Sequence, residues 1–281
     1  SFEVYLETNG MGDGILNDSV LTGNINTVTT LNVDNQNISD LTGIEDFTAL
    51  GWLQCYNNQL TTLDVSNNTA LTYLECDFNQ LTILDVSQNT ALTFLNCRAN
   101  QLTSLDVSNN TVLTDFRCQS NQLTSLDVSN NTVLTDLRCQ YNQLTSLDVS
   151  NNTVLTNLWC YSNQLTSLDL RNHSLSSLSI NTSYNPQLFC IDVDNPLLAQ
   201  SLQSMPMDID YWTSFSTNCA TAFGCMDSLA CNYDSTVTIP DSSCSYLPIT
   251  LNNDQVICSG FSDATLTVIY NTGSYTFLWS N

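Results

Sequence analysis

The side chains that could do chemistry in this sequence are thiols, carboxylates, aromatic rings and a few guanidinium groups. There are 12 cysteines and 27 acidic residues, but one histidine (His173), four arginines and no lysine. A single imidazole makes histidine-based catalysis and His-rich metal sites poor candidates. The formal net charge of −23 repels phosphate backbones and anionic lipid, so nucleic acid and membrane surfaces are poor partners. No apolar run is long enough to span a bilayer.

Half of the cysteines recur every 21 residues: Cys55, Cys76, Cys97, Cys118, Cys139 and Cys160. If these positions stack on neighbouring strands, parallel side chains keep their Cβ atoms about 4.8 Å apart, which is longer than a disulfide prefers. Cysteine is also a small side chain that is readily buried. We therefore expect this ladder to be structural, with its thiols reduced and inaccessible.

Aromatic and arginine side chains gather around these cysteines, at positions that change from one repeat to the next. They are the residue types that carry binding energy at interfaces, and they also stack on sugars and pair with carboxylates. An alternative is that Trp52, Tyr73 and Phe94 stack across strands for stability alone. The predicted ligand-binding residues are Trp52, Tyr56, Tyr73, Glu75, Phe94, Arg98, Arg117, Arg138, Trp159 and Tyr161.

Carboxylates form a second ladder, which hardly varies: Asp64, Asp85, Asp106, Asp127 and Asp148. We expect these to be solvated and bonded to turn amides, with a calcium strip as the alternative. Nearer the C-terminus, oxygens of Asp227, Asn232, Asp234 and Asp241 could converge on Ca²⁺, or could belong to turn residues. No cofactor other than this possible calcium is expected.

The elements that position these residues are successive copies of one repeat. Five 21-residue units run without insertion from Leu60 to Gln164, each with the pattern L-x-x-L-x-C-x-x-N-Q-L. This pattern is similar to that of leucine-rich repeats, with Cys at a usual Leu position. The alternation around Leu74 and Cys76 predicts a strand whose neighbours, including Asp77, point outward. Asn79 is predicted to bond the backbone of the adjacent turn. The S-L-D-V-S-N-N-T half predicts a second extended segment. Stacked coils then form a β-solenoid with a parallel sheet.

The ends of such a stack need caps, because they expose apolar core and unpaired strand edges. Helical spacing of Phe2, Tyr5 and Leu6 predicts a short N-terminal helix. We expect an N-terminal cap over 1–30, the solenoid over 31–188, a C-terminal cap over 189–223, a small Cys-rich module over 224–247 and the start of an Ig- or PKD-like β domain over 248–281. We also expect the native protein to continue past Asn281.

The six remaining cysteines lie at irregular spacing, which is typical of disulfides in an oxidising, extracellular setting. Fifteen connectivities are open to six cysteines. The pairing that we favour is Cys190–Cys219 in the cap and Cys225–Cys244 in the next module, with Cys231 and Cys258 paired to each other or to other chains. No C-x₂-C spacing is present for zinc.

The coils resemble the internalin-like leucine-rich repeat proteins that Bacteroidota export to their surface. The resemblance covers roughly residues 1–219 and includes NISDLTGIEDFTAL (37–50), LTSLDVSNNT and NPQLFCIDVDNP (185–196). GCMDSLACNYD and DSSC look like a cysteine module of such proteins, and ICSG…YTFLWSN looks like the start of an Ig- or PKD-like domain. Three triplets, such as Asp18-Ser-Val, look like Bacteroidota O-glycosylation sites. The resemblance implies a secreted or outer-membrane-surface location and the type IX secretion route.

Three functions remain open. The first is a non-enzymatic recognition or adhesion module that binds a protein or glycan at the cell surface. The second is a structural spacer or accessory subunit on an outer-membrane transport or secretion complex. The third is the non-catalytic part of a longer secreted enzyme. No nucleophile motif, phosphate loop or Cys–His pair is recognisable, so we expect no enzyme activity.

Overall fold

The computed structural model describes residues 1–17, 19–201, 207–230, 232–237 and 239–245. The chain forms two compact units, residues 1–219 and 220–281. The predicted β domain over 248–281, Cys231, Cys258 and Asp18 lie outside the described residues. No helix in the described part is long and apolar enough to cross a membrane.

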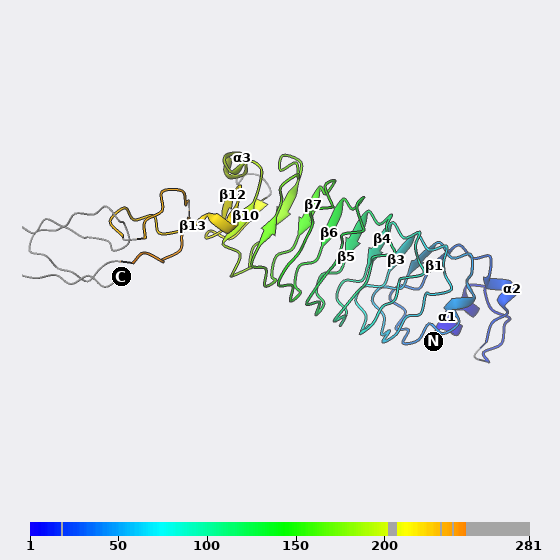
Figure 1. The fold of residues 1–281 in the computed structure, drawn as a ribbon. Coiled ribbons are helices and arrows are strands. Elements are labelled where there is room, and N and C mark those ends of the chain that lie inside the picture. The colour runs from blue at the N-terminus through cyan, green and yellow to red at the C-terminus, as the bar shows by residue number, and fades with distance from the viewer. Residues whose placement is uncertain (18, 202–206, 231, 238, 246–281) are drawn as a thin grey trace, which may run out of the picture. The chain divides into compact units, whose positions relative to one another are not determined.

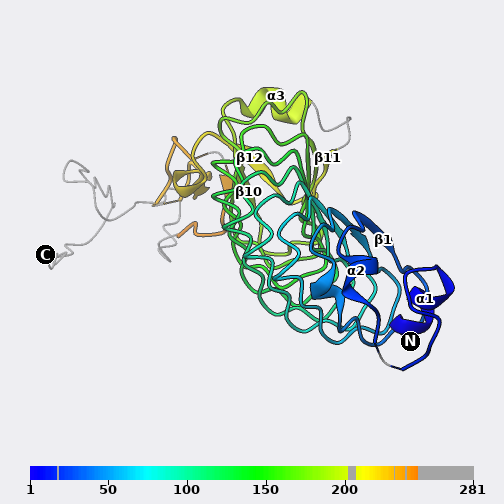
Figure 2. The same ribbon diagram turned by 90° about the vertical axis from the view of Figure 1, so that its right-hand side faces the viewer.

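The first unit is a β-solenoid whose main sheet is parallel and has nine strands in its described part (Figures 1 and 2). Its strand order is β1-β2-β3-β4-β5-β6-β7-β9-β11, so along the described chain each coil adds a strand beside the preceding one. Residues 21 positions apart lie side by side on neighbouring strands: Trp52 lies beside Tyr73, and Tyr73 lies beside Phe94. The strands are β1 (Thr30–Asn32), β2 (Trp52–Gln54), β3 (Tyr73–Glu75), β4 (Phe94–Asn96), β5 (Asp115–Arg117), β6 (Asp136–Arg138), β7 (Asn157–Trp159), β9 (Ser179–Asn181) and β11 (Met207–Asp208). The predicted parallel-sheet solenoid is confirmed.

The core is a column of leucines repeated from coil to coil. In each regular coil the middle residue of the strand is fully buried, as Leu74 and Leu95 are, and Phe116 fills the same position in β5. Burying a leucine side chain stabilises a fold by about 1.5–3 kcal/mol. Because each coil contributes several such residues, stacking neighbours is what makes a single coil stable.

Two asparagine ladders hold the turns of neighbouring coils together. As predicted, Asn79 donates from Nδ2 to the carbonyls of Cys55 (3.0 Å) and Cys76 (3.1 Å), and its Oδ1 accepts from the amide of Leu60 (3.0 Å). A second ladder was not predicted. In it, fully buried Asn131 donates to the carbonyls of Val107 (3.1 Å) and Asn110 (2.9 Å), one coil back. These amides supply bonds that backbone groups in buried turns need.

The cysteine ladder lies inside the solenoid. All six thiols are free and fully buried, as the sequence predicts. Burial raises the pKa of Cys97 and of Cys160 to about 12, and it raises the pKa of the others as well. A buried thiol with a raised pKa is a poor nucleophile, so this ladder packs rather than reacts.

The prediction of a second extended segment in every coil is wrong. In the regular coils this half contains turns, and the pairing there is an isolated bridge between Asp64 and Asp85. The reason is local: each ladder aspartate accepts a hydrogen bond from the amide two residues on, as Asp106 does from Ser108 (2.8 Å), which bends the chain. Strands form on this side at the C-terminal end, in the sheet β12-β10-β8. Their bounds are β8 (Leu168–Asp169), β10 (Cys190–Asp192) and β12 (Ser214–Ser216).

Both ends of the solenoid carry helical segments. The predicted N-terminal helix is present as α1 (Phe2–Thr8), which buries Phe2 and Leu6 and begins at Ser1, whose hydroxyl accepts from the amide of Val4. The short segments α2 (Thr22–Ile25) and η1 (Ile44–Asp46) follow. At the other end lie α3 (Pro196–Ser201) and η3 (Cys219–Thr221), and the predicted Cys190–Cys219 disulfide is formed.

The second unit is small in its described part. It contains the parallel pair β13 (Phe223–Gly224) and β14 (Ile239–Pro240). The predicted Cys225–Cys244 disulfide closes it. A disulfide is a common means of stabilising a segment too short to build a large core.

Candidate binding surface

The outer side of the sheet carries the residues that differ between coils. Each strand has three residues, and because side chains alternate across a strand, the two flanking the buried middle residue face outward. We call these flanking residues of β2–β7, together with residues 56, 77, 98, 119, 140 and 161, the variable face. All ten predicted ligand-binding residues belong to it, in aligned rows.

Three aromatic rings form a stack along the first row. The ring centroids of Trp52 and Tyr73 are 3.5 Å apart with an interplanar angle of 3°, and those of Tyr73 and Phe94 are 4.2 Å apart at 4°. Trp52, at the end of the stack, is 38% exposed, and the other two are half-buried. Stacking across strands for stability therefore accounts for part of the role of these rings, because the ring faces inside the stack are covered by neighbouring rings. What remains open to a ligand is the ring edges and the exposed part of Trp52, which lies beside Thr30 of β1.

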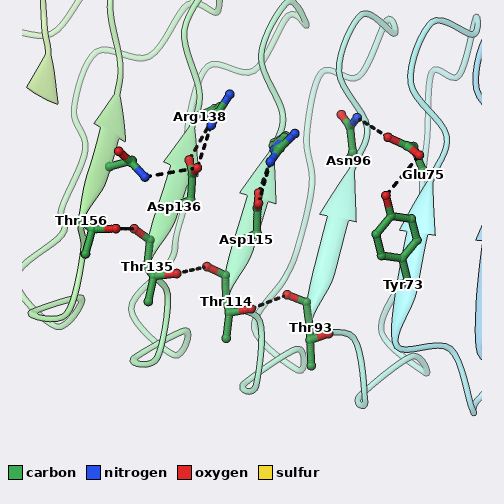
Figure 3. Close-up of polar contacts among 12 residues, drawn as sticks. Tyr73, Glu75, Thr93, Asn96, Thr114, Asp115, Thr135, Asp136, Arg138 and Thr156 are labelled. Carbon is green, nitrogen blue, oxygen red and sulfur yellow. Dashed lines mark hydrogen bonds and ion pairs between the residues drawn. The ribbon is translucent and has the colours of Figure 1, made fainter. Parts of the chain in front are cut away.

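Two arginines of the variable face are paired within their own strands. Arg117 binds Asp115 through Nε (2.9 Å) and Nη2 (2.7 Å), and Arg138 binds Asp136 through Nε (3.0 Å) and Nη2 (2.8 Å). Residues two apart on a strand share a face, so this pairing follows from the D-x-R spacing. Figure 3 shows the pair of Asp136 and Arg138 on its strand.

The same guanidinium groups also lie over aromatic rings of adjacent coils. The Arg117 guanidinium is 5.1 Å from the centroid of the Phe94 ring and thus extends the stack, and that of Arg138 is 4.4 Å from the centroid of Trp159. Bidentate pairing and cation–π contact together fix the orientation of these long side chains. The face is therefore preorganised, and a ligand would meet ordered rather than mobile arginines.

Glu75 is the centre of a hydrogen-bond network on three strands. It accepts from Nε2 of Gln54 (2.9 Å), from the hydroxyl of Tyr73 (3.2 Å) and from Nδ2 of Asn96 (3.3 Å). Figure 3 shows Glu75 bonded to Tyr73 of its own strand and to Asn96 of the next strand. Burial, followed by the charge of Glu75, raises the pKa of Tyr73 to about 12. Figure 3 also shows the threonine row that borders the strands, in which Thr114 and Thr135 each donate to the carbonyl one coil back.

A hollow of about 350 Å³ opens beside this network. It is lined by Tyr56, Asn57, Glu75, Asp77 and Phe78. Asp77 is 7% exposed and its Oδ1 has no hydrogen-bond partner, so the expectation that Asp77 simply points into solvent is wrong. Burial and then the charge of Glu75 raise the pKa of Asp77 to about 6.

A second group of rings lies at the far end of the variable face. Tyr141 and Tyr161 contact edge to face with centroids 5.1 Å apart, next to the pair of Arg138 and Trp159. The remaining predicted residue, Arg98, lies 4.8 Å from the centroid of the Phe78 ring. Phe78 and Tyr141 are not among the predicted ligand-binding residues. Both occupy the position before the ladder asparagine, which reads Asn, Phe, Ala, Ser, Tyr and Ser from coil to coil, and that variation is the signal that identifies them.

The predicted calcium ligands of the second unit bind their own turns. Oδ1 of Asp234 accepts from the amide of Thr236 (2.8 Å), Oδ1 of Asp241 from that of Ser243 (2.8 Å) and Oδ1 of Asp227 from that of Leu229 (2.9 Å). Asn232 bonds the backbone of Ser243 and Ser245. Within the described ranges no group of three or more His, Cys, Asp or Glu is arranged to hold a metal ion. Calcium binding stays a prediction.

The aspartate ladder on the other side of the solenoid has the geometry expected of turn residues. Its carboxylates are exposed, and each accepts from a serine amide, as Asp64 does from Ser66 (2.9 Å). Hydrogen bonds from the side chain and then from the amide of these serines lower the pKa of four of the five, namely Asp64, Asp85, Asp106 and Asp127. The ladder therefore serves the local fold, in keeping with its constancy from coil to coil.

Comparison with known proteins relates the chain to bacterial and plant solenoids. A family model described as the LVIVD repeat matches residues 76–97, which is about one coil. No curated protein matches the chain. Among solved structures, the functional domain of InlJ from Listeria monocytogenes, described as including a cysteine ladder, is 30% identical over 79% of this chain, with a TM-score of 0.45. The chain spans 63% of the length of that InlJ domain.

Two further structures share the fold more closely in space. Internalin C2 from Listeria monocytogenes is 20% identical, with 76% of this chain and 92% of that chain covered and a TM-score of 0.52. The leucine-rich repeat ectodomain of the Arabidopsis thaliana receptor kinase GASSHO1/SCHENGEN3, solved with CASPARIAN STRIP INTEGRITY FACTOR 2, is 22% identical, with 63% and 23% covered and a TM-score of 0.51. The first unit of this chain therefore has an internalin-like leucine-rich repeat fold.

Proposed function

We propose that this chain is a non-enzymatic recognition module that binds another protein through the variable face, outside the cell. The observation that carries the proposal is the concentration of ordered aromatic and arginine side chains on the side of the solenoid that varies, while the other side repeats one turn. Structural demands are the same in every coil, so they do not account for Trp52 in one coil and Asp115 in another at the same position.

The physical character of the face favours a protein ligand over a glycan. Sugar binding by aromatics uses ring faces, and the inner faces of the stack are covered by neighbouring rings. Ring edges flanked by ordered, ion-paired arginines are typical of protein interfaces, where aromatic and arginine side chains dominate the binding energy. The similar plant ectodomain was itself solved in complex with another protein, named CASPARIAN STRIP INTEGRITY FACTOR 2.

The cellular setting belongs to the same proposal. The two disulfides favour an oxidising, extracellular compartment. Display on a bacterial surface after type IX secretion, with further domains after the solenoid, is the setting that the sequence resemblance implies. Adhesion is the role that such a location gives to a protein-binding face.

The test replaces Trp52, Tyr73 and Phe94 together with Ser and measures binding of the labelled fragment to the native cell surface and to a glycan array. We expect surface binding to be lost while circular dichroism shows the solenoid retained. A matched control replaces Val112, Val133 and Val154 with Ser, since these exposed apolar residues also recur every 21 residues but lie outside the variable face. That control should bind normally.

Unchanged attachment of the aromatic variant would contradict the proposal and favour the spacer function. Loss of glycan binding instead of protein binding would correct the ligand class. Because the stack also contributes to stability, a second variant, Trp52→Arg, changes the most exposed ring of the stack alone. It should weaken binding with a smaller fall in the thermal unfolding midpoint than the triple variant, because it removes only one of the two stacking contacts.

A further inference from the structure

The hollow beside β3 combines negative charge with aromatic surface. The carboxylates of Asp34, Glu75 and Asp77 are close enough to repel one another, and Arg98 is the cation that acts on Asp77. Three carboxylates against one guanidinium leave the site with net negative charge. The rings of Tyr56 and Phe78 form part of its wall.

The acids of this site differ from other carboxylates of the variable face in having no bound cation. Asp115 and Asp136 each hold an arginine in a bidentate pair. Across the described residues the ion pairs are those of Arg117, Arg138 and Arg171, so neither Glu75 nor Asp77 takes part in one. Asp77 is 7% exposed, lines the hollow and has an Oδ1 without a hydrogen-bond partner. A buried carboxylate oxygen left in this way is unfavourable unless a donor arrives.

The chemistry of the walls identifies that donor. An anion would be repelled, and a neutral apolar group would leave the Asp77 oxygen unsatisfied. An ammonium or guanidinium group can donate to carboxylates while its methylene stem or charge lies against aromatic rings. We propose that this hollow binds a lysine or arginine side chain of the protein partner. This rests on the proposed function and gives its partner a basic contact surface, in keeping with the charge of −23.

Protonation of the site supplies a second signature. Burial raises the pKa of both Asp34 and Asp77 to about 6, with Glu75 adding repulsion to each and Arg98 lowering that of Asp77. At pH 7.5 both acids are ionised, and at pH 5 both are largely protonated. A bound cation should therefore be released on acidification over this range.

The experiment titrates the whole chain with the blocked peptide Ac-Gly-Lys-Gly-NH₂ at low salt and follows backbone amide NMR signals. Ac-Gly-Gln-Gly-NH₂ is the uncharged control peptide. We expect the lysine peptide to shift amides of residues 56–57 and 75–78 saturably at pH 7.5 and less at pH 5, and the glutamine peptide to leave them unshifted. The double variant Glu75→Gln/Asp77→Asn should bind about tenfold more weakly.

A matched variant separates this site from the general negative field. Asp106→Asn/Asp127→Asn removes the same formal charge from exposed turn residues on the other side of the solenoid. It should weaken peptide binding about twofold or less, because exposed charges are screened. Equal weakening in both double variants, or shifts spread over the whole acidic surface, would overturn the proposal. If the double variant unfolds, the isosteric single variant Asp77→Asn replaces it.

Two further outcomes also decide the question. Saturable shifts of the same amides by Ca²⁺ alone, with no response to the lysine peptide, would make the hollow a metal site and overturn the proposal. Failure here is distinguishable from failure of the proposed function: if Glu75→Gln/Asp77→Asn keeps cell-surface binding while the aromatic variant loses it, the variable face binds a partner without this contact.

Discussion

The indole ring of Trp52 and the phenol ring of Tyr73 lie parallel on adjacent coils, with centroids 3.5 Å apart. Phe94 and then the guanidinium of Arg117 continue the same column. Three consecutive coils thus contribute aromatic rings, and a fourth coil contributes a cation, to one continuous stack of side chains. Such a column both stabilises the coils beneath it and presents a defined edge to a partner.

We expect Tyr73→Ala to lower the free energy of unfolding by about 1–3 kcal/mol, because it removes both stacking contacts of the central ring at about 0.5–1.5 kcal/mol each. Urea unfolding followed by circular dichroism measures this. The matched variant Tyr73→Phe keeps the ring and loses only the hydrogen bond to Glu75, so it should change stability by about 1 kcal/mol or less. Equal effects of the two variants would show that the ring contacts contribute nothing.

The buried asparagine ladder makes a second prediction. Asn131 is fully buried and donates to two carbonyls, whereas its neighbour Asn130 is exposed and donates to one, the carbonyl of Ser108 at 3.2 Å. We expect Asn131→Ala to destabilise the fold by about 1–3 kcal/mol, since it removes two hydrogen bonds to buried carbonyls, which keep only their backbone donors. Asn130→Ala should cost about 0.5 kcal/mol. Similar unfolding midpoints for the two variants would contradict this account of the ladder.

A third prediction concerns a residue whose backbone angle φ is positive. Tyr184 has φ = 58° and its side chain is 72% exposed. The left-handed region costs a side chain with a Cβ about 1–2 kcal/mol, and asparagine tolerates it better. Tyr184→Asn should therefore raise the free energy of unfolding by about 0.5 kcal/mol. Tyr184→Ala, which retains the unfavourable backbone angle, should give no gain, and a gain equal to that of Asn would refute the explanation.

The pH dependence of stability follows from two groups of acids. Asp34 and Asp77 have pKa values raised to about 6, so between about pH 4 and 6 the folded state binds more protons than the unfolded state, and stability falls as pH rises. The exposed ladder aspartates have lowered pKa values, so their contribution is lost below about pH 4. Stability should be greatest between about pH 4 and 5.

A single variant isolates the first group. Asp77→Asn should reduce the stability difference between pH 5 and pH 7.5 by about 1–1.5 kcal/mol, because it removes one of the two raised carboxyl groups. Urea midpoints at the two pH values give the comparison. Asp106→Asn should leave the difference unchanged, because the pKa of Asp106 is lowered, not raised. A wild-type chain equally stable at both pH values would rule out the raised pKa values.

Most of the fold was predictable because the sequence contains its own comparison. Five copies of one coil identify Cys76 and Asn79 as positions that every coil requires, and their burial and bonding follow. The S-L-D-V-S half does not reveal its structure in this way, since an alternating pattern also fits a chain bent by aspartate-capped turns such as that of Asp106. The burial of Asp77 is not predictable from the repeat for a different reason. Its burial depends on neighbouring coils, and pattern within one coil carries no information about that cover.

The strict repeat has a consequence for how such a chain can change. The bonds between coils join residues of constant separation, such as the 21 residues from Asn131 to Asn110. Removing or inserting one whole unit would leave every residue of the remaining coils beside an equivalent residue. The solenoid could therefore be shortened or lengthened by whole coils without a new fold. Each added or removed coil would change the distance between the aromatic column with the acidic hollow and the distal ring group. The number of coils therefore sets the spacing of contacts that a partner must match.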